Sequence, residues 1–342
     1  MAINNTFKRE TPLLEVKNLQ TGFKIDGEYY NAVEDVSFYV NRKQIVGIVG
    51  ESGCGKSVMS LSIMQLLAQG IGEIRGGEIK FEDKVISTMS DKEMNQIRGK
   101  DISMIFQEPM TSLNPVFTIG YQIEEVLLNH EKITKKVARE KAIALLKSVG
   151  IPRAEKIVDE YPHQLSGGMR QRVMIAISIA CQPKLLIADE PTTALDVTVQ
   201  AQILELLKNI QEVNDMSIIL ITHDLGVVAE ICDEVIVMYA GKIAERANVV
   251  ELFERPKHPY TQLLMQAIPK MDEDVEKLAT IDGLVPSLKD MPEVGCRFAN
   301  RCPKAMPQCT VITPVLNETE AGHEVACHLY DMSIVKEGAT VR

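Results

Sequence analysis

The spacing G-x-x-x-x-G-K-S, which is typical of a phosphate-binding loop, occurs at Gly50-Glu51-Ser52-Gly53-Cys54-Gly55-Lys56-Ser57. Glycines there let backbone N–H groups point inward around an anion, at the positive end of a helix dipole. We expect Lys56 to reach the β- and γ-phosphates of a nucleoside triphosphate and Ser57 to ligate Mg²⁺. A glycine-rich turn that holds a lysine by chance is the alternative, and the strand and helix predicted on either side argue against it. The predicted nucleotide ligands in this loop are Gly50, Ser52, Gly53, Cys54, Gly55, Lys56 and Ser57.

Two acidic residues, Asp189 and Glu190, follow the apolar run at residues 185–188. A buried strand would deliver both to the carboxyl edge of a parallel sheet, where ligands bind in open α/β folds. We expect Asp189 to hold Mg²⁺ opposite Ser57, and Glu190 to polarise the attacking water as a general base. Solvated charges at a strand end are the alternative, and the phosphate loop in the same chain favours the catalytic interpretation.

Gln107 and His223 also end apolar runs, so both are expected to face the same cleft. We assign them to the catalytic set with Glu190 and Lys56, and we add Gln107 to the Mg²⁺ ligands. Each would otherwise be an ordinary solvated or satisfied polar residue.

A second loop, Ser166-Gly167-Gly168, precedes a helix-like stretch and is again suited to phosphate. One nucleotide needs one primary phosphate cradle. The sequence therefore predicts a dimer in which the second loop of each chain closes over the nucleotide of its partner.

The seven cysteines are unevenly distributed. Four of them, Cys296, Cys302, Cys309 and Cys327, lie towards the C-terminus with the spacing C-x₅-C-x₆-C-x₁₇-C. In a reducing compartment such a group favours metal binding over disulfides. The lack of a C-x₂-C pair favours a [4Fe–4S] cluster over Zn²⁺, with free thiols as a third possibility. Cys54 is separate: beside Lys56 and inward N–H groups, we expect a reactive thiolate close to the triphosphate.

The whole chain has 342 residues, 45% apolar and 25% charged, with a net charge of -10. It contains no apolar run of about 18 residues and no secretory h-region at its N-terminus. We therefore expect a cytoplasmic chain that does not span the membrane. No long block of Lys and Arg is present, which argues against nucleic acid as a partner.

The elements that must position these residues alternate between strands and helices, as in a mostly parallel α/β sheet. Residues 13–19 and 32–40 alternate apolar and polar side chains and predict antiparallel edge strands. Residues 22–30 predict a turn-rich link in which Phe23 stacks on an adenine ring, an ordinary packing role being the alternative. Predicted buried strands cover 45–49, 102–106, 185–189 and 217–221, and predicted helices cover 58–67, 91–98, 119–128, 135–149 and 199–213. From residue 254 proline becomes frequent, which indicates a smaller appended module.

Taken together, these motifs resemble the ATP-binding subunits of ABC transporters over roughly residues 12–255. In that family Gln107 is the Q-loop, 165–169 the signature, 185–189 the Walker B strand and His223 the switch residue. Ala194-Leu195-Asp196 matches the D-loop, so Asp196 joins the predicted nucleotide site with Ser166, Gly167 and Gly168. Two departures are Arg42-Lys43-Gln44, in place of a common Gly-Glu turn, and Cys54, where Ser is frequent.

The resemblance implies a P-loop NTPase fold of the ABC ATPase type. Its parts are a mostly parallel sheet, an antiparallel edge subdomain, an inserted helical subdomain at about 108–160 and a small C-terminal extension. We expect an ATPase domain at 1–255 and the extension at 256–342.

A narrower resemblance, to oligopeptide/dipeptide import ATPases, rests on residues 107–115, on His258-Pro259-Tyr260-Thr261 and on the four-cysteine tail. It implies ATP hydrolysis that drives peptide import, and some members hold an iron–sulfur cluster in this tail. Nickel or another small solute remains an alternative cargo. A soluble ABC ATPase acting on DNA or the ribosome is a weaker alternative, because one cassette is present and no heptads separate Ser57 from Leu165.

The partners implied are a second ABC ATPase subunit, a paralogue in a head-to-tail dimer, and two transmembrane permease subunits. An extracytoplasmic peptide-binding protein acts indirectly. The subunit would sit at the cytoplasmic face of the cell membrane, with residues 110–146 against the permease.

Overall fold

The computed structural model describes residues 11–108, 112–193, 195–267 and 281–331. Residues 109–111 of the Q-loop segment and Ala194 of the predicted D-loop lie outside the described residues.

The main sheet has eight strands in the order β11-β12-β10-β9-β3-β8-β7-β6. Its central strands β9, β3, β8, β7 and β6 are parallel to one another, while β10, β12 and β11 continue the sheet in antiparallel pairs. The bounds are β3 Ile45–Val49, β6 Ile102–Ile105, β7 Leu185–Asp189, β8 Ser217–Ile221, β9 Glu234–Tyr239, β10 Lys242–Asn248, β11 Asn317–Glu320 and β12 His323–Val325.

The parallel strands are buried on both faces, which is why they read as continuous apolar runs. In β3, Ile45 and Val49 face the core beneath the helices, while Val46 and Ile48 face the second core beneath the antiparallel sheet. The prediction of a mostly parallel α/β sheet is confirmed.

A second, four-stranded sheet is antiparallel, in the order β2-β1-β4-β5. Its strands are β1 Leu14–Ile25, β2 Glu28–Val40, β4 Gly72–Phe81 and β5 Lys84–Val85. The predicted turn-rich link at 22–30 is wrong except at Asp26 and Gly27, whose φ values of 53° and 91° make a tight hairpin turn. A turn with two positive φ values matches the twist of the flanking strands, so pairing continues to the turn.

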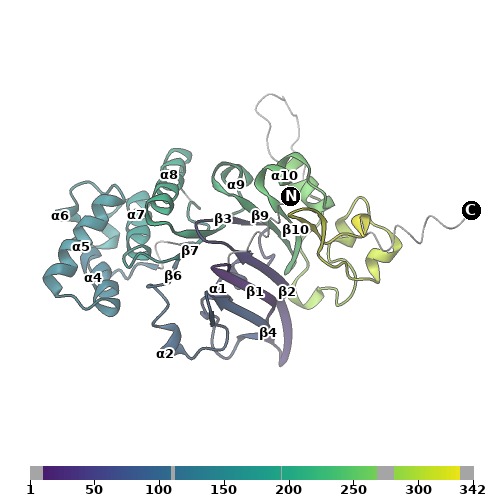
Figure 1. The fold of residues 1–342 in the computed structure, drawn as a ribbon, viewed down its shortest axis with the longest axis horizontal. Helices are drawn as coiled ribbons and strands as arrows, with labels where there is room; N and C mark the ends of the chain where they lie inside the picture. Colours follow the sequence, from purple (N-terminus) through teal and green to yellow (C-terminus); the bar gives the residue numbers. More distant parts are fainter. Residues whose placement is uncertain (1–10, 109–111, 194, 268–280, 332–342) are drawn as a thin grey trace, which may run out of the picture.

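The helices divide into three groups (Figure 1). Helix α1 Lys56–Ile63 contributes Met59 and Ile63 to the core between the two sheets. Helices α8, α9 and α10 lie on the opposite side of the main sheet, and α4, α5, α6 and α7 gather at its β6 end. Their bounds are α4 Ile119–His130, α5 Lys135–Ser148, α6 Ala154–Ile157, α7 Gly167–Ser178, α8 Val197–Asn214, α9 Leu225–Ile231 and α10 Val249–Glu254. The short helix α2, Asp91–Met94, covers only half of the predicted 91–98.

The C-terminal segment returns to the body of the molecule (Figure 1). After α11 Pro259–Gln266, it forms short 3₁₀ turns, including Ala299–Arg301 and Pro307–Thr310, and then strands β11 and β12. Strand β12 pairs with β10, Glu245 opposite Val325, so the extension is continuous with the main sheet. No helix within the described ranges is long and apolar enough to cross a membrane.

Candidate functional site

The phosphate loop connects β3 to α1, and two of its glycines are required by close backbone contacts. A Cβ at Gly50 would lie 2.2 Å from the Met238 carbonyl oxygen. One at Gly55, which has a φ of 102° and caps α1, would lie 2.7 Å from the Ala32 carbonyl oxygen. Both separations are too short for any side chain, so the spacing of the motif reflects the packing of the loop against β2 and β9.

Lys56 is nearly buried, and its ammonium group lies inside the loop. Its Nζ donates hydrogen bonds to the carbonyl oxygens of Gly50, at 2.7 Å, and Glu51, at 3.1 Å. These neutral acceptors hold a positive charge in the position that would face phosphate oxygens, which are stronger acceptors for a cation.

Asp189 ends β7, and only 5% of this residue is exposed. Burial raises the pKa of its carboxyl group, while a hydrogen bond from Ser57 opposes the shift. Its Oδ1 atom is buried with no hydrogen-bond partner. A buried carboxylate oxygen without a partner is costly, and beside a serine hydroxyl it fits a Mg²⁺ ligand pair.

Glu190 collects three polar partners from three different segments. Its Oε2 accepts hydrogen bonds from Gln107 Nε2 and Thr193 Oγ1, both at 2.9 Å. Its Oε1 lies 3.4 Å from Nδ1 of His223. The φ of Glu190 is 48°, in the left-handed region, and this backbone is held by its N–H group bonding to Ile221 O at 2.8 Å. Sequence reasoning brought Gln107, Glu190 and His223 together but missed Thr193.

The cleft in front of the phosphate loop is also lined by residues of other segments. Phe23 of β1 lines it together with Ala32 of β2, and stacking of Phe23 on an adenine ring stays a prediction. Residues 285–288 of the C-terminal extension also line it, and sequence reasoning did not assign them to the site. These residues form a proline-containing stretch after a linker with little sequence pattern, so no feature of the sequence indicates that they belong to the site.

The second predicted phosphate loop lies apart from this cleft. Ser166 caps α7 by accepting a hydrogen bond from the Met169 N–H, and both Ser166 and Gly167 are exposed. Asp196 caps α8 in the same way, accepting from the Val199 N–H at 2.9 Å. Neither loop lines the cleft of the phosphate loop in the same chain.

The Cys54 thiol does not behave as predicted. It is 1% exposed, and its sulfur is tucked behind the loop, 2.8 Å from where a Gly50 Cβ would stand. Burial raises the pKa of Cys54, which outweighs the opposing effect of Lys56. The expectation of a reactive thiolate facing the phosphates is therefore wrong, and the buried sulfur instead lies 3.7 Å from Nζ of Lys56.

The four C-terminal cysteines do come together in space. Cys296, Cys302, Cys309 and Cys327 line one small pocket with His258 and His328. All four are free, and the backbone N–H of Cys296 donates to the carbonyl oxygen of Cys309 at 2.7 Å. Within the described part of the chain, no three His, Cys, Asp or Glu side chains are grouped closely enough to hold a metal ion. The residue types suit a metal, whereas the side-chain positions in this conformation do not form a ligand set.

Comparison with known proteins agrees with this geometry. A family model described as ABC transporter matches residues 33–193, and one described as oligopeptide/dipeptide transporter, C-terminal region, matches residues 244–309. The chain is 54% identical to the oligopeptide transport ATP-binding protein AppD of Bacillus subtilis (strain 168), covering 96% of this chain and 98% of that protein. It is 51% identical to the dipeptide transport ATP-binding protein DppD of the same organism, covering 93% and 95%.

Among solved structures, the chain is similar to a dimeric post-hydrolysis state of the ATP-binding cassette MJ0796 bound to ADP and Pi. The TM-score is 0.63 at 28% identity, over 69% of this chain and 98% of that one.

Proposed function

Because the chain belongs to the oligopeptide/dipeptide group of ABC transporter ATP-binding proteins, we propose that it binds and hydrolyses ATP to drive import of oligopeptides or dipeptides. The observation that carries the ATPase activity is that Lys56, Ser57 and Glu190 line one cleft, with Asp189 hydrogen-bonded to Ser57. The peptide cargo is supported by the relatives and by the match to the transporter C-terminal region.

Lys56 exchanges its two carbonyl acceptors for the β- and γ-phosphates when ATP binds. The loop N–H groups at 50–57 hold the remaining phosphate oxygens, and Phe23 contacts the adenine. Mg²⁺ would be held by Ser57, Asp189 and Gln107, and it would neutralise charge on the phosphate oxygens. The partnerless Oδ1 of Asp189 supports this assignment.

Glu190 is the proposed general base that polarises the attacking water. Gln107, Thr193 and His223 contact its carboxylate and would orient it. General-base assistance of this kind is worth about 10²–10⁴ in rate.

The complete site is formed by two subunits. Ser166, Gly167, Gly168 and Asp196 would contact the nucleotide of a second ABC ATPase, a paralogue arranged head-to-tail. Ser166, Gly167 and Asp196 are exposed, and none of the four residues lines the cleft of its own chain, which supports this arrangement. The similar MJ0796 cassettes are described as dimeric.

In the cell the subunit would lie at the cytoplasmic face of the membrane, on two transmembrane permease subunits that receive peptide from an extracytoplasmic binding protein. We divide the chain into an ATPase domain at 1–255, with a helical subdomain inserted at about 108–160, and an extension at 256–342. No nucleic acid is needed for this activity.

The test is reconstitution of the full chain with its paralogue and permease in vesicles containing the binding protein. ATP hydrolysis that rises with added di- or oligopeptide is the expected result. Stimulation by Ni²⁺ but not by peptide would favour the alternative small-solute cargo. Absence of ATP hydrolysis would overturn the ATPase assignment itself.

The four C-terminal cysteines form the proposed ligand set of a [4Fe–4S] cluster, with Zn²⁺ as the alternative. Their shared pocket supports this, although the thiols would need to move closer together to ligate. A cluster would supply iron–thiolate bonds that order a segment with few apolar residues of its own.

A further inference from the structure

Glu51, the first variable residue of the phosphate loop, is held from two directions by the C-terminal part of the chain. Arg301 donates two parallel hydrogen bonds to its carboxylate, Nη1 to Oε2 at 2.7 Å and Nη2 to Oε1 at 2.9 Å. The hydroxyl oxygen of Tyr260 accepts a hydrogen bond from the Glu51 N–H at 2.9 Å. Bidentate pairs of this kind fix direction as well as distance.

Arg301 is also held by hydrogen bonds to groups other than Glu51. Its side chain is 7% exposed, and its Nε donates to the Asp282 carbonyl oxygen at 2.8 Å. Its two Nη atoms also donate to the Tyr239 hydroxyl and to the carbonyl oxygen of Ile281, each at 3.2 Å. These hydrogen bonds fix the position of the guanidinium group, which belongs to the C-terminal extension.

The backbone of Glu51 in turn positions the groups that meet phosphate. Its carbonyl oxygen accepts hydrogen bonds from Lys56 Nζ at 3.1 Å and from the Cys54 N–H at 3.3 Å. The carboxylate, the N–H and the carbonyl of one residue therefore connect the extension to the lysine of the loop. A loop that already has its binding shape loses less conformational freedom when the nucleotide arrives.

We propose that Arg301 is a positioning residue of the ATP site, through which the C-terminal extension holds the phosphate loop in its nucleotide-binding shape. The inference rests on the proposed function only for the identity of the nucleotide. Arg301 does not line the cleft, so the proposed effect is indirect and passes through its contact with Glu51.

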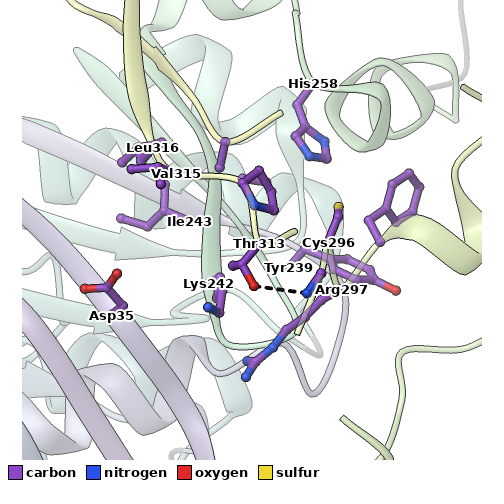
Figure 2. A pocket seen from close by; sticks show the side chains of 15 residues that line it. Asp35, Tyr239, Lys242, Ile243, His258, Cys296, Arg297, Thr313, Val315 and Leu316 are labelled. Carbon is purple, nitrogen blue, oxygen red and sulfur yellow. Dashed lines mark hydrogen bonds between the residues drawn. The ribbon is translucent and has the colours of Figure 1, made fainter. Parts of the chain in front are cut away.

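The pocket lined by the four cysteines is connected to Arg301 through the chain. Arg301 ends the 3₁₀ turn Ala299–Arg301 between Cys296 and Cys302, both of which line that pocket. Figure 2 shows Cys296 and Arg297 beside Tyr239, where the extension meets strands β9 and β10. Because Arg301 lies between two of these cysteines, a change that orders the cysteine segment should also fix the position of Arg301. Such a change should therefore alter the affinity of the phosphate loop for nucleotide.

The experiment measures the affinity of the full chain for Mg²⁺–ADP by calorimetric titration, which reads one phosphate loop without hydrolysis. Arg301→Gln should weaken ADP binding by about two- to thirty-fold, the usual range for a residue that couples through its neighbours. The ADP affinity of Arg301→Lys should lie between those of the wild type and Arg301→Gln, because lysine keeps the positive charge but cannot form the bidentate pair. In steady-state hydrolysis the KM for ATP should rise while kcat stays nearly constant, since no reacting group is touched.

The matched control is Arg255→Gln, which removes an exposed arginine paired with Glu251 and Glu320, away from the phosphate loop. It should leave ADP affinity unchanged. Glu51→Gln should weaken ADP binding about as much as Arg301→Gln. The double variant should bind ADP with the same affinity as the more affected of the two single variants, because both substitutions break the same contact. Additive losses would overturn the inference.

Unchanged ADP affinity in Arg301→Gln would also overturn it. If that variant does not fold, as judged by thermal unfolding, an unchanged affinity in Glu51→Gln has the same consequence. A wild-type chain that fails to bind Mg²⁺–ADP would instead overturn the proposed function.

Discussion

Gln107 donates a hydrogen bond from Nε2 to Oε2 of Glu190 at 2.9 Å and so links the ends of two adjacent parallel strands. Strand β6 ends two residues before Gln107 and β7 ends directly before Glu190, so the two strand ends bring the predicted Q-loop residue against the proposed base. Any displacement of Gln107 when nucleotide binds would therefore be transmitted to the carboxylate that activates water.

Replacing Glu190 with Gln should lower the rate of ATP hydrolysis by about 10²–10⁴ while retaining nucleotide binding, because the amide keeps the shape but cannot accept the proton. The measurement is steady-state hydrolysis together with Mg²⁺–ADP titration. Glu205→Gln, at an exposed position of α8, is the control and should hydrolyse ATP normally. Hydrolysis within a few-fold of wild type would remove Glu190 from the role of base.

Lys56→Ala should act at a different step. It deletes the ammonium that Gly50 and Glu51 hold in the loop, so nucleotide affinity should fall by at least about ten-fold, as for loss of a charge-assisted hydrogen bond of roughly 1.5–3 kcal/mol. Direct titration with Mg²⁺–ADP separates this from a loss of kcat. An unchanged dissociation constant would show that the lysine does not contact the phosphates.

The parts of the site that sequence alone predicted are those carried by buried parallel strands. Runs such as 185–188 are apolar throughout because both faces are covered, and the polar residue that follows such a run must appear at the shared edge. Gln107, Glu190 and His223 were placed together by this argument alone.

The sequence alone could not predict contacts between distant segments that share no pattern of apolar and polar residues. Arg301 and Glu51 are 250 residues apart, and nothing in the spacing of either indicates the other. The direction of Cys54 was unpredictable for a related reason, since a loop motif specifies backbone positions and leaves the side chains to the surrounding packing. Here that packing turns the thiol inward.

The Cys54 thiol should label slowly with a maleimide at neutral pH, more slowly than Cys181, which is partly exposed. Burial raises the pKa of Cys54, so the thiolate fraction is smaller at any given pH, and labelling should increase only above the usual thiol range. MgATP should make little difference, because the sulfur already lies behind the loop. Mass spectrometry of the labelled peptides gives the rates, and unfolded chain provides the control in which all seven cysteines react. Rapid labelling that MgATP prevents would contradict the buried position.

Tyr121, at the start of α4, should be part of the permease contact. It stacks on Phe117 with ring centroids 4.6 Å apart, and with Val116 the two rings form an exposed apolar group on the proposed helical subdomain. Tyr121→Ala should reduce co-purification with the permease by about ten-fold or more, as for a buried aromatic anchor, and leave ADP affinity unchanged. Tyr39→Ala, equally exposed on the antiparallel sheet, is the control. Equal recovery of the permease with both variants would rule out this surface.

The last prediction concerns the metal content of the extension. Full-length protein purified without oxygen should contain about four iron and four acid-labile sulfide per chain, with Cys296, Cys302, Cys309 and Cys327 as ligands. Cys302→Ser should lower both contents and the thermal stability of the extension, while Cys181→Ser, outside the pocket, should change neither. Because Cys302 directly follows Arg301, Cys302→Ser should also weaken Mg²⁺–ADP binding in the same direction as Arg301→Gln. Stoichiometric zinc without sulfide would replace the cluster with a zinc site, and four freely alkylated thiols without metal would exclude both. Loss of metal with unchanged ADP affinity would show that the pocket and the phosphate loop are not connected through Arg301.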